Sequence, residues 1–222
     1  MPVFNEEVTI RGVIKDVLNQ RMVDKLIIVY EPSTDNTLKY IQSMLPDKRI
    51  TLIKNKKQMG KGYSVRRGIN IIEDKKENVI IIQDADKEYS PKDYTSLMSH
   101  FSYNSPVIGE RTVIIGHRYR LGSYANSMHT FLFNLLFRQN VRDVNACYKV
   151  FNKEMISGHI FKQNGWNFDM ELAITFAKKG YKIKNAPIQY KGRTFEEGKK
   201  IGAGAAIEFV FYLLKERFNK NV

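Results

Sequence analysis

The segment VIIIQDADKEYSPKDY, from Val79 to Tyr94, decides the fold class. Its four β-branched apolar residues are typical of a strand buried on both faces, and Ser90-Pro91 marks the start of a helix. Between these two signals stand Asp84 and Asp86. Side chains two residues apart in an extended segment point to the same side, so both carboxylates can reach one cation. The segment therefore predicts a buried strand with a candidate cation site at its carboxyl end.

This carboxylate pair has two interpretations. Carboxylate oxygens suit Mg²⁺ or Mn²⁺, which typically bridge a protein carboxylate and the phosphates of a substrate. The alternative is that Asp86 or Ser90 only caps the helix that begins at Pro91. A D-x-D triplet alone does not decide between them.

On the N-terminal side of this segment, apolar strands alternate with amphipathic helices. LIIVY (26–30) and TLIKN (51–55) are strand-like, and helices are expected after Asn5, after EPSTDNT (31–37) and after MGKGYSVRRG (59–68). This alternation predicts an α/β fold with a mostly parallel central sheet covered by helices on both faces. Ligands of such sheets gather at the carboxyl ends of the strands, where Asp84 and Asp86 stand.

The pattern changes after Pro91, but no linker separates the two parts, which favours one domain. The sequence predicts these further elements in order: a helix over 92–101, a strand at PVIGE (106–110), a basic loop over 111–126, an aromatic-rich helix through Phe137, a helix over 168–180 ended by Gly180, an extended segment over 181–190 and an amphipathic helix over 203–218.

Composition limits the class of protein. The chain has 222 residues, 43% of them hydrophobic, which is enough for one well-buried domain. Lys and Arg outnumber Asp and Glu by 36 to 23, giving a net charge of +13 that favours anionic partners. The single cysteine, Cys147, excludes an intrachain disulfide and is expected in the core. The sequence shows no signal peptide and no apolar run long enough to span a bilayer.

Seven blocks of the sequence, taken in order, resemble the family 2 glycosyltransferases with a GT-A (Rossmann-like) fold, particularly the dolichyl-phosphate mannose synthase-like, or polyprenyl-phosphate glycosyltransferase, branch. The blocks are PVFNEE (2–7), IIVYEPSTDNT (27–37), NKKQMGKGYSVRRG (55–68), QDADKEYSP (83–91), VRDVNACYKVF (141–151), GWNFDMEL (165–172) and YKGRTFEEGKK (190–200). The resemblance implies a nucleotide-sugar-binding half over 1–104 and an acceptor-binding half over 105–222 that ends in an amphipathic helix.

The resemblance also implies a donor site for a UDP- or GDP-sugar. Asp84 and Asp86 would hold Mg²⁺ or Mn²⁺ on the donor diphosphate, with Glu88 as a further metal ligand. The nucleotide pocket and its surroundings would be formed by Pro2, Val3, Asn5, Glu6, Glu31, Lys61 and Arg66.

On the acceptor side, the resemblance implies basic residues that meet the phosphate of a polyprenyl phosphate. They are Arg111, Arg118 or Arg120 in HRYRLGS, and the late pair Arg193 and Lys199. The hydroxyl of Ser123 in the same segment would join them. For any one of these basic residues, solvated surface charge is an equally good interpretation.

Two departures from the family pattern stand out. The family's first strand would precede Pro2, so we expect this sheet to lack it, which would leave an exposed sheet edge or an unsupported nucleotide pocket. In addition, Glu31-Pro32 stands where the family usually has an acidic residue followed by Asp or Gly. Pro32 has no backbone N–H to donate a hydrogen bond, so the pattern does not identify the nucleotide sugar.

The implied reaction is an inverting displacement with oxocarbenium character at the anomeric carbon. A polyprenyl phosphate is already anionic, so its attack needs no general base. A sugar hydroxyl as acceptor would need one, with Asp169 as the first candidate and Glu171 as the second. Capping of the helix in FDMEL is the structural alternative for Asp169.

Three other readings remain at this stage. A soluble glycosyltransferase acting on a saccharide hydroxyl and a catalytically silent relative both fit the motifs. A nucleic-acid-binding module fits poorly, because Lys and Arg are scattered and no recognition motif is present. The single cysteine fits a reducing compartment such as the cytoplasm. The basic surface, the aromatic helix around 131–137 and the amphipathic tail at 205–218 predict contact with the cytoplasmic face of an anionic membrane, although core packing is the simpler role for most apolar residues of the tail.

Overall fold

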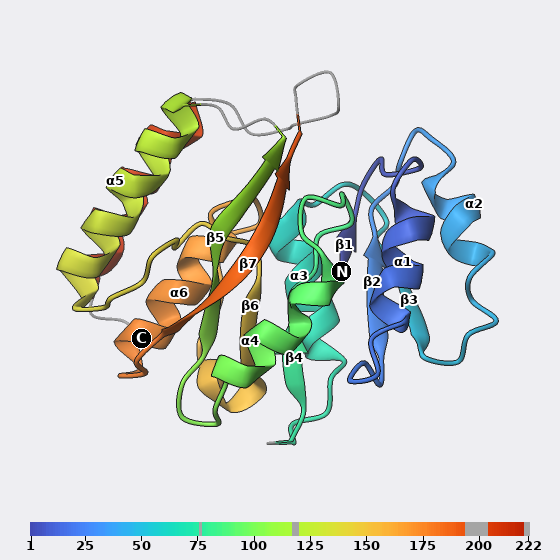
Figure 1. Cartoon of the computed structure of the whole chain (residues 1–222), viewed down its shortest axis with the longest axis horizontal. Helices are drawn as coiled ribbons and strands as arrows, with labels where there is room; N and C mark the ends of the chain where they lie inside the picture. The colour runs from blue at the N-terminus through green and yellow to red at the C-terminus, as the bar shows by residue number, and fades with distance from the viewer. Residues whose placement is uncertain (76, 117–119, 194–203, 220–222) are drawn as a thin grey trace.

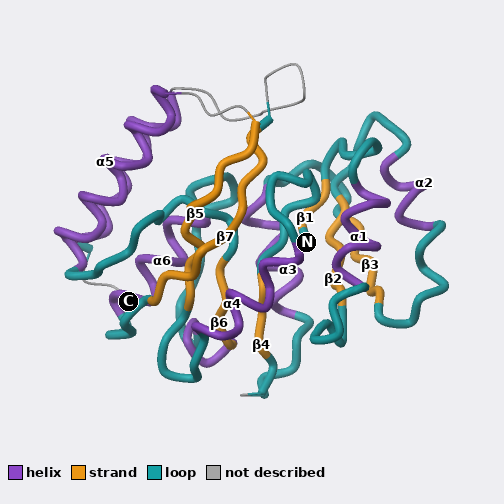
Figure 2. The backbone as a smooth tube through the Cα atoms, viewed as in Figure 1, coloured by secondary structure: helices purple, strands orange, loops and turns teal. Residues whose placement is uncertain are grey.

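The computed structural model describes residues 1–75, 77–116, 120–193 and 204–219. Two sheets lie side by side in it, with helices packed on both faces (Figure 1 and Figure 2). The α/β class expected from the alternating pattern is confirmed.

The first sheet is parallel and has the strand order β1-β2-β3. Its strands are β1 (Pro2–Val3), β2 (Leu26–Tyr30) and β3 (Ile50–Lys54), with Pro2 opposite Val29 and Leu26 opposite Ile50. The helices of this half are α1 (Ile10–Leu18), α2 (Thr37–Gln42) and α3 (Lys61–Asn70). The apolar stripe of α1 is buried, which fixes this helix on the sheet.

The second sheet is mixed and has the order β4-β6-β5-β7. Its strands are β4 (Val79–Ile81), β6 (Lys149–Asn152), β5 (Val107–Gly116) and β7 (Lys184–Gly192). β6 runs antiparallel to both β4 and β5, whereas β5 and β7 are parallel. The expected parallel sheet therefore describes the first half of the chain, and the second half adds an antiparallel strand.

Helices of the second half cover the mixed sheet. α4 (Tyr94–His100) follows a short 3₁₀ turn at Pro91–Asp93 and packs on β5 and β7, and α6 (Phe168–Lys178) lies behind these strands next to α3 (Figure 1). α5 (Arg120–Phe137) and α7 (Gly204–Phe218) pack against each other at the far end of the molecule from α1 and α2 (Figure 1). A second 3₁₀ turn covers Lys153–Ile156.

Three details differ from the sequence expectations. A short first strand is present, since Pro2 and Val3 pair in parallel with β2. The first helix begins at Ile10 rather than after Asn5, because Asn5 has a left-handed φ of 50° and Glu6 is turned into the interior. The expected basic loop over 111–126 is largely regular structure: its β-branched run at 112–115 extends β5 to Gly116, and α5 starts at Arg120.

Candidate active site

The candidate site lies where chain segments leave the carboxyl ends of β1, β2 and β4. The loop after β4 carries Asp84, Asp86 and Glu88 and is tied to β7 by a bridge between Tyr89 and Tyr190 and by a 2.8 Å hydrogen bond from the Lys191 amide to the Glu88 carbonyl. This places the aspartates at the sheet edge where the sequence predicted them. The connection to β7 also brings the end of that strand to the same place.

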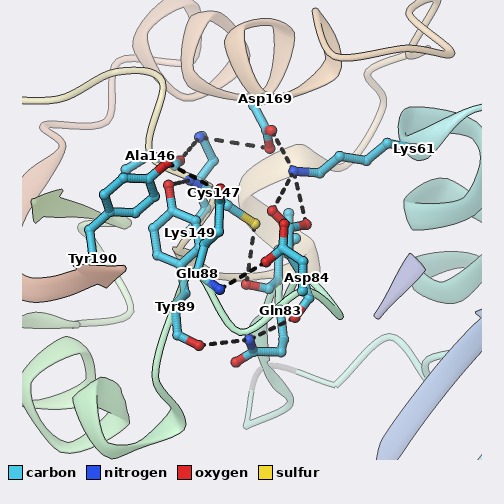
Figure 3. Close-up of polar contacts among 12 residues, drawn as sticks. Lys61, Gln83, Asp84, Glu88, Tyr89, Ala146, Cys147, Lys149, Asp169 and Tyr190 are labelled. Atoms are coloured by element: carbon cyan, nitrogen blue, oxygen red, sulfur yellow. Dashed lines mark hydrogen bonds and ion pairs between the residues drawn. The ribbon is translucent and has the colours of Figure 1, made fainter. Parts of the chain in front are cut away.

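Lys61, the first residue of α3, bridges two carboxylates in this site. Its ammonium nitrogen is 3.0 Å from Asp84 Oδ1 and 2.8 Å from Asp169 Oδ2, as Figure 3 shows. The same nitrogen lies 5.4 Å from the centre of the Trp166 ring. Burial acts to lower the pKa of Lys61, but the charges of Asp169 and Asp84 outweigh it and raise the pKa well above its ordinary value. Lys61 is therefore a fixed positive charge between two parts of the chain.

Two glycines allow this bridge to form. Gly60 has a φ of +94°, which disfavours any other residue. A Cβ on Gly62 would lie 2.5 Å from the Gln163 carbonyl oxygen and 2.6 Å from Phe168 Cβ. The G-K-G sequence thus lets the start of α3 contact the segment that leads into α6, and Lys61 reaches Asp169 as a result.

Asp84 is a partly buried, ionised carboxylate whose side chain is 15% exposed. Burial acts to raise its pKa, but the charge of Lys61 and hydrogen bonds from the Cys147 thiol and Lys61 outweigh burial and lower the pKa. Cys147 is buried, as expected for a core residue, and burial together with the charge of Asp84 raises the pKa of its thiol. The thiol therefore acts as a neutral donor in this cluster.

Asp86 has the opposite electrostatic environment. Burial, with the negative charges of Asp84 and Glu88, raises its pKa to about 7, although Arg193 acts against this rise. Arg193 Nη2 lies 2.7 Å from Asp86 Oδ2, and Arg193 Nε lies 3.5 Å from Glu88 Oε1. Neighbouring carboxylates and one guanidinium thus form a compact acidic cluster at the end of β7.

Sequence reasoning missed one buried lysine in this region. Lys149 on β6 is 0% exposed; its ammonium nitrogen is 2.6 Å from the Ala146 carbonyl oxygen and 3.8 Å from Asp169 Oδ1 (Figure 3). Burial lowers its pKa, partly offset by Asp169. The available signal was a lysine inside the apolar run CYKVF (147–151), which requires a buried partner.

Asp169 and Glu171 occupy different environments on α6. Asp169 lies between the ammonium groups of Lys61 and Lys149 and does not cap the helix; its Oδ1 atom is buried and accepts no hydrogen bond in the described part of the chain. Glu171 accepts hydrogen bonds of 2.8 and 3.0 Å from the backbone amides of Lys162 and Gln163. Asp169 therefore belongs to the candidate site, and Glu171 orders the loop before α6.

The side chains of the site fit a divalent metal in their chemistry. Asp84 and Asp86 offer carboxylate oxygens, and the repulsion between them would be relieved by a cation. Across the described residues, no three Asp, Glu, His or Cys side chains form a ready-made metal site. Glu88, expected as a third ligand, instead contacts Arg193 and accepts a 3.1 Å hydrogen bond from the Tyr190 hydroxyl. The donor set matches a metal held by two carboxylates and completed by substrate phosphates.

The structure brings only some of the residues expected near the nucleotide to one place. Pro2 and Val3 form β1, and Asn5 accepts a 2.9 Å hydrogen bond from the Thr34 amide, which joins the loops after β1 and β2. Glu31 was expected to face the base or ribose, but it is 3% exposed and accepts a 2.7 Å hydrogen bond from Ser64. Arg66 donates to the Phe161 carbonyl at 2.7 Å and to Asn164. Glu31 and Arg66 therefore have internal partners in this structure.

The residues expected at the acceptor phosphate are also divided. Arg111 forms a two-pronged pair with Asp143, with Nε–Oδ2 and Nη2–Oδ1 distances of 2.5 and 2.8 Å, and its guanidinium lies 5.0 Å from the centre of the Tyr190 ring. Sequence reasoning did not identify Asp143. Arg120 and Ser123 lie in the first turns of α5, while Arg118 and Lys199 lie outside the described residues. Only Arg193 of this set reaches the carboxylate cluster in the described chain.

Comparison with known protein families gives one match that spans most of the chain. The model described as Glycosyl transferase family 2 matches residues 1–159. An uncharacterized protein of Methanocaldococcus jannaschii is 30% identical over 193 residues, which are 82% of this chain and 82% of that protein. Glycosyltransferase AglJ of Haloferax volcanii is 26% identical over 195 residues; the match covers 86% of this chain but only 62% of AglJ.

Solved structures share the fold. Glucosyl-3-phosphoglycerate synthase from Mycobacterium tuberculosis in complex with UDP superposes with a TM-score of 0.73 at 16% identity, covering 99% of this chain and 79% of that one. The same synthase with Mn²⁺, UDP and phosphoglyceric acid gives a TM-score of 0.72 at 19% identity, with 99% and 78% covered. At these identities the likeness concerns the fold, and it confirms the expected GT-A arrangement.

Proposed function

Starting from the fact that the chain belongs to glycosyl transferase family 2, we propose that this glycosyltransferase moves a sugar from a UDP- or GDP-sugar to a polyprenyl phosphate, with inversion at the anomeric carbon. The observation that carries the donor side is the placement of Asp84 and Asp86 at the strand edge, beside the fixed charge of Lys61. Residues 1–104 would form most of the donor site and residues 105–222 most of the acceptor site.

Asp84 and Asp86 would hold Mg²⁺ or Mn²⁺, the ions named with the structurally similar synthase. When bound, the metal would neutralise charge on the departing diphosphate. Glu88 could join these ligands only after giving up its contacts with Arg193 and Tyr190. The positive charge of Lys61, held in place by Asp169, would orient the same diphosphate.

The environment of Asp169 favours a phosphate acceptor. Its carboxylate is within 2.8 Å of one ammonium nitrogen and 3.8 Å of another. The carboxylate is engaged by these two ammonium groups, so its contacts are those of a group that positions Lys61. A polyprenyl phosphate is anionic before it attacks, so its reaction depends on positioning and charge neutralisation instead of on a base. The Arg111 guanidinium, which is paired with Asp143, would then also contact the acceptor phosphate.

The surface of α5 and α7 favours a lipid acceptor. Exposed apolar side chains recur at helical spacing on α5 and on α7; we call them the α5–α7 stripe, and its members are Tyr124, Met128, Phe131, Leu135, Phe211, Leu214 and Phe218. None of the helices in the described chain combines the length and apolar character that crossing a bilayer requires. With a net charge of +13, this surface is suited to lying on an anionic membrane.

One observation supports a second candidate, transfer to a hydroxyl group. Asp169 Oδ1 is buried without a hydrogen-bond partner in the described chain, so one lone pair of the carboxylate is open to a proton donor. The structurally similar synthase is described with phosphoglyceric acid and with glycerol 3-phosphate as ligands. A hydroxyl acceptor would require Asp169 to act as general base.

Sugar transfer by wild type and Asp169→Asn distinguishes the two acceptors. Radiolabelled UDP- and GDP-sugars would be offered with Mn²⁺ and either a polyprenyl phosphate in detergent or phosphoglyceric acid. With a phosphate acceptor, the variant should keep its activity within about tenfold, because only the positioning of Lys61 is affected. With a hydroxyl acceptor, the same substitution would remove the general base, lower kcat by about 10²- to 10⁴-fold and abolish the acidic limb of the pH–rate profile.

Glu171→Gln on the same helix is the matched control. Glu171 bonds backbone amides outside the proposed chemistry, so its variant should behave alike with either acceptor. Transfer only to phosphoglyceric acid would contradict the lipid proposal. No transfer from any donor to either acceptor would favour a catalytically silent protein.

A further inference from the structure

The Arg193 side chain is the cation of the acidic cluster, which consists of Glu6, Asp86 and Glu88. Its Nη2 is 2.7 Å from Asp86 Oδ2, its Nη1 is 3.5 Å from Glu6 Oε2 and its Nε is 3.5 Å from Glu88 Oε1. The carboxylates come from the loops after β1 and β4, and Arg193 directly follows β7. One guanidinium thus contacts three carboxylates from two other segments and offsets part of their charge.

The contacts of Arg193 are mainly electrostatic and include few well-matched hydrogen bonds. Only the contact with Asp86 is short, and Arg193 Nε is buried without a hydrogen-bond partner in the described chain. Arg111 provides the contrast, because two of its nitrogens are matched to the two oxygens of Asp143. The planar fork of arginine fits a carboxylate best in such a two-pronged pair. Arg193 therefore has the properties of a counter-ion that another cation can replace.

We propose that Arg193 is a built-in counter-ion that occupies the place of the divalent cation in the free protein, so that metal and Arg193 compete for Asp86. This inference rests on the proposed function, in which Asp84 and Asp86 hold the metal. A divalent ion on the Asp86 carboxylate and a guanidinium 2.7 Å from the same oxygen repel each other strongly in a partly buried site. Binding of the metal therefore requires the guanidinium to move away.

The competition makes metal and nucleotide binding depend on each other. A metal ion alone must displace Arg193 from Asp86 and so deprive the guanidinium of its one anion at short range in the described chain. A diphosphate that arrives with the metal supplies that anion, and planar guanidinium groups match phosphate geometry well. Metal should therefore bind weakly without nucleotide and much more tightly with it, and the two affinities are linked by one coupling free energy.

Titration of Mn²⁺ in the absence of nucleotide, followed by electron paramagnetic resonance of the free ion, tests this competition directly. Wild type would be compared with Arg193→Gln, Arg193→Lys and Arg142→Gln. We expect Arg193→Gln to bind Mn²⁺ about tenfold or more tightly than wild type, within the range typical of such couplings. Arg193→Lys retains the positive charge and should stay within about threefold of wild type.

Arg142→Gln controls for the lost charge. The side chain of Arg142 is 66% exposed, and its contact with Glu110 is long, at 4.0 Å. Its replacement should therefore leave the Mn²⁺ affinity unchanged. Addition of UDP should tighten Mn²⁺ binding much less in Arg193→Gln than in wild type. A melting temperature for each variant, with and without Mn²⁺, reports folding, and Arg193→Gln should gain more thermal stability from Mn²⁺ than wild type gains.

An unchanged or weaker Mn²⁺ affinity in folded Arg193→Gln would overturn the inference. If wild type nevertheless binds Mn²⁺ with UDP and loses it in Asp84→Ala/Asp86→Ala, only the counter-ion role of Arg193 has failed. If no variant binds Mn²⁺ with or without UDP or GDP, the proposed metal site fails, and the inference fails with it. An equal gain of affinity in Arg142→Gln would show a general charge effect and would also contradict it.

Discussion

Asp84 and Asp86 are separated by one residue but have different protonation properties. The pKa of Asp84 is lowered, since Lys61 and hydrogen bonds outweigh burial, whereas burial and two neighbouring carboxylates raise the pKa of Asp86 to about 7. Asp84 is a permanent anion, and Asp86 depends on a nearby cation for its charge. The raised pKa of the second aspartate fits a site that takes a cation, and the Arg193 proposal rests separately on the 2.7 Å contact between Arg193 and Asp86.

The Arg111–Asp143 pair provides a test of buried electrostatics outside the metal site. Burial acts to raise the pKa of Asp143, but Arg111 outweighs it and lowers the pKa. The pair therefore stabilises the fold fully above the unfolded pKa of about 3.9 and loses this contribution as pH falls through the lower folded pKa. Asp143→Asn should lower the free energy of unfolding by about 3 kcal/mol at pH 7, and this difference should shrink below about pH 4.

Urea denaturation of both proteins between pH 7 and pH 2.5 measures the difference. Asp47→Asn removes a carboxylate from the more exposed pair with Arg49 and should have a much smaller effect. A loss at pH 7 no larger than that of Asp47→Asn, or a difference that persists undiminished at pH 2.5, would contradict the role assigned to Asp143.

From the sequence we could identify site residues that follow a strand or belong to a motif. We could not identify the residues on distant segments that contact them. Asp84 and Asp86 could be placed from the strand that precedes them. Lys149 and Asp143 could not, because their roles depend on Asp169 and Arg111, which only the fold brings close. The internal position of Glu31 was missed for the same reason, since Ser64 and Asn55 come from other elements.

Among the elements, α3 packs tightly at its start against the segment that leads into α6. Gly62 has no space for a Cβ, whereas a Cβ on Gly68 of the same helix would make ordinary contacts of 3.4 and 3.6 Å with Val29 and Ile27. Gly62→Ala should cost about 1–3 kcal/mol of stability and lower nucleotide affinity, because Lys61 is pushed away from Asp169. Gly68→Ala should be neutral or stabilising by up to about 1 kcal/mol.

Thermal denaturation and UDP titration of the two variants check this contrast. Equal effects of the two substitutions on stability would show that the close approach of α3 to the segment before α6 is not a constraint. Full nucleotide affinity in a destabilised Gly62→Ala would separate packing from the placement of Lys61.

Element type could be predicted well where a periodic pattern was long, and strand direction could not. α6, α7 and the end of α6 at Gly180 followed from helical spacing and a glycine with φ of +83°. The antiparallel strand β6 was not predicted, because its run of four residues, Lys149–Asn152, is short, is buried throughout and begins with a lysine. The extension of β5 was missed because its arginine and threonine resembled a loop.

For the whole molecule, the α5–α7 stripe predicts binding to anionic vesicles. Phe131, Leu135 and Phe211 are 64%, 64% and 68% exposed, so their joint replacement by serine should leave the fold intact. Because burial of each large apolar side chain is worth about 1.5–3 kcal/mol, the triple variant should bind vesicles at least about tenfold more weakly. Flotation with phosphatidylglycerol-containing vesicles measures the change.

Val8→Ser/Ile160→Ser is the matched control, since these residues are 90% and 79% exposed outside the stripe. Its vesicle binding should equal that of wild type. Equal binding by the triple variant, or an equal loss in the control, would contradict a membrane-facing role for α5 and α7.

The central claim is that Asp84 and Asp86 form a metal-dependent site for the donor nucleotide. Calorimetric titration of UDP and GDP, with and without Mn²⁺, into wild type and Asp84→Ala/Asp86→Ala tests it most directly. We predict that one nucleotide binds wild type only, or far more tightly, with Mn²⁺, and that the double variant loses this metal-dependent binding. Failure of wild type to bind either nucleotide with Mn²⁺, or undiminished binding by the folded double variant, would contradict the claim.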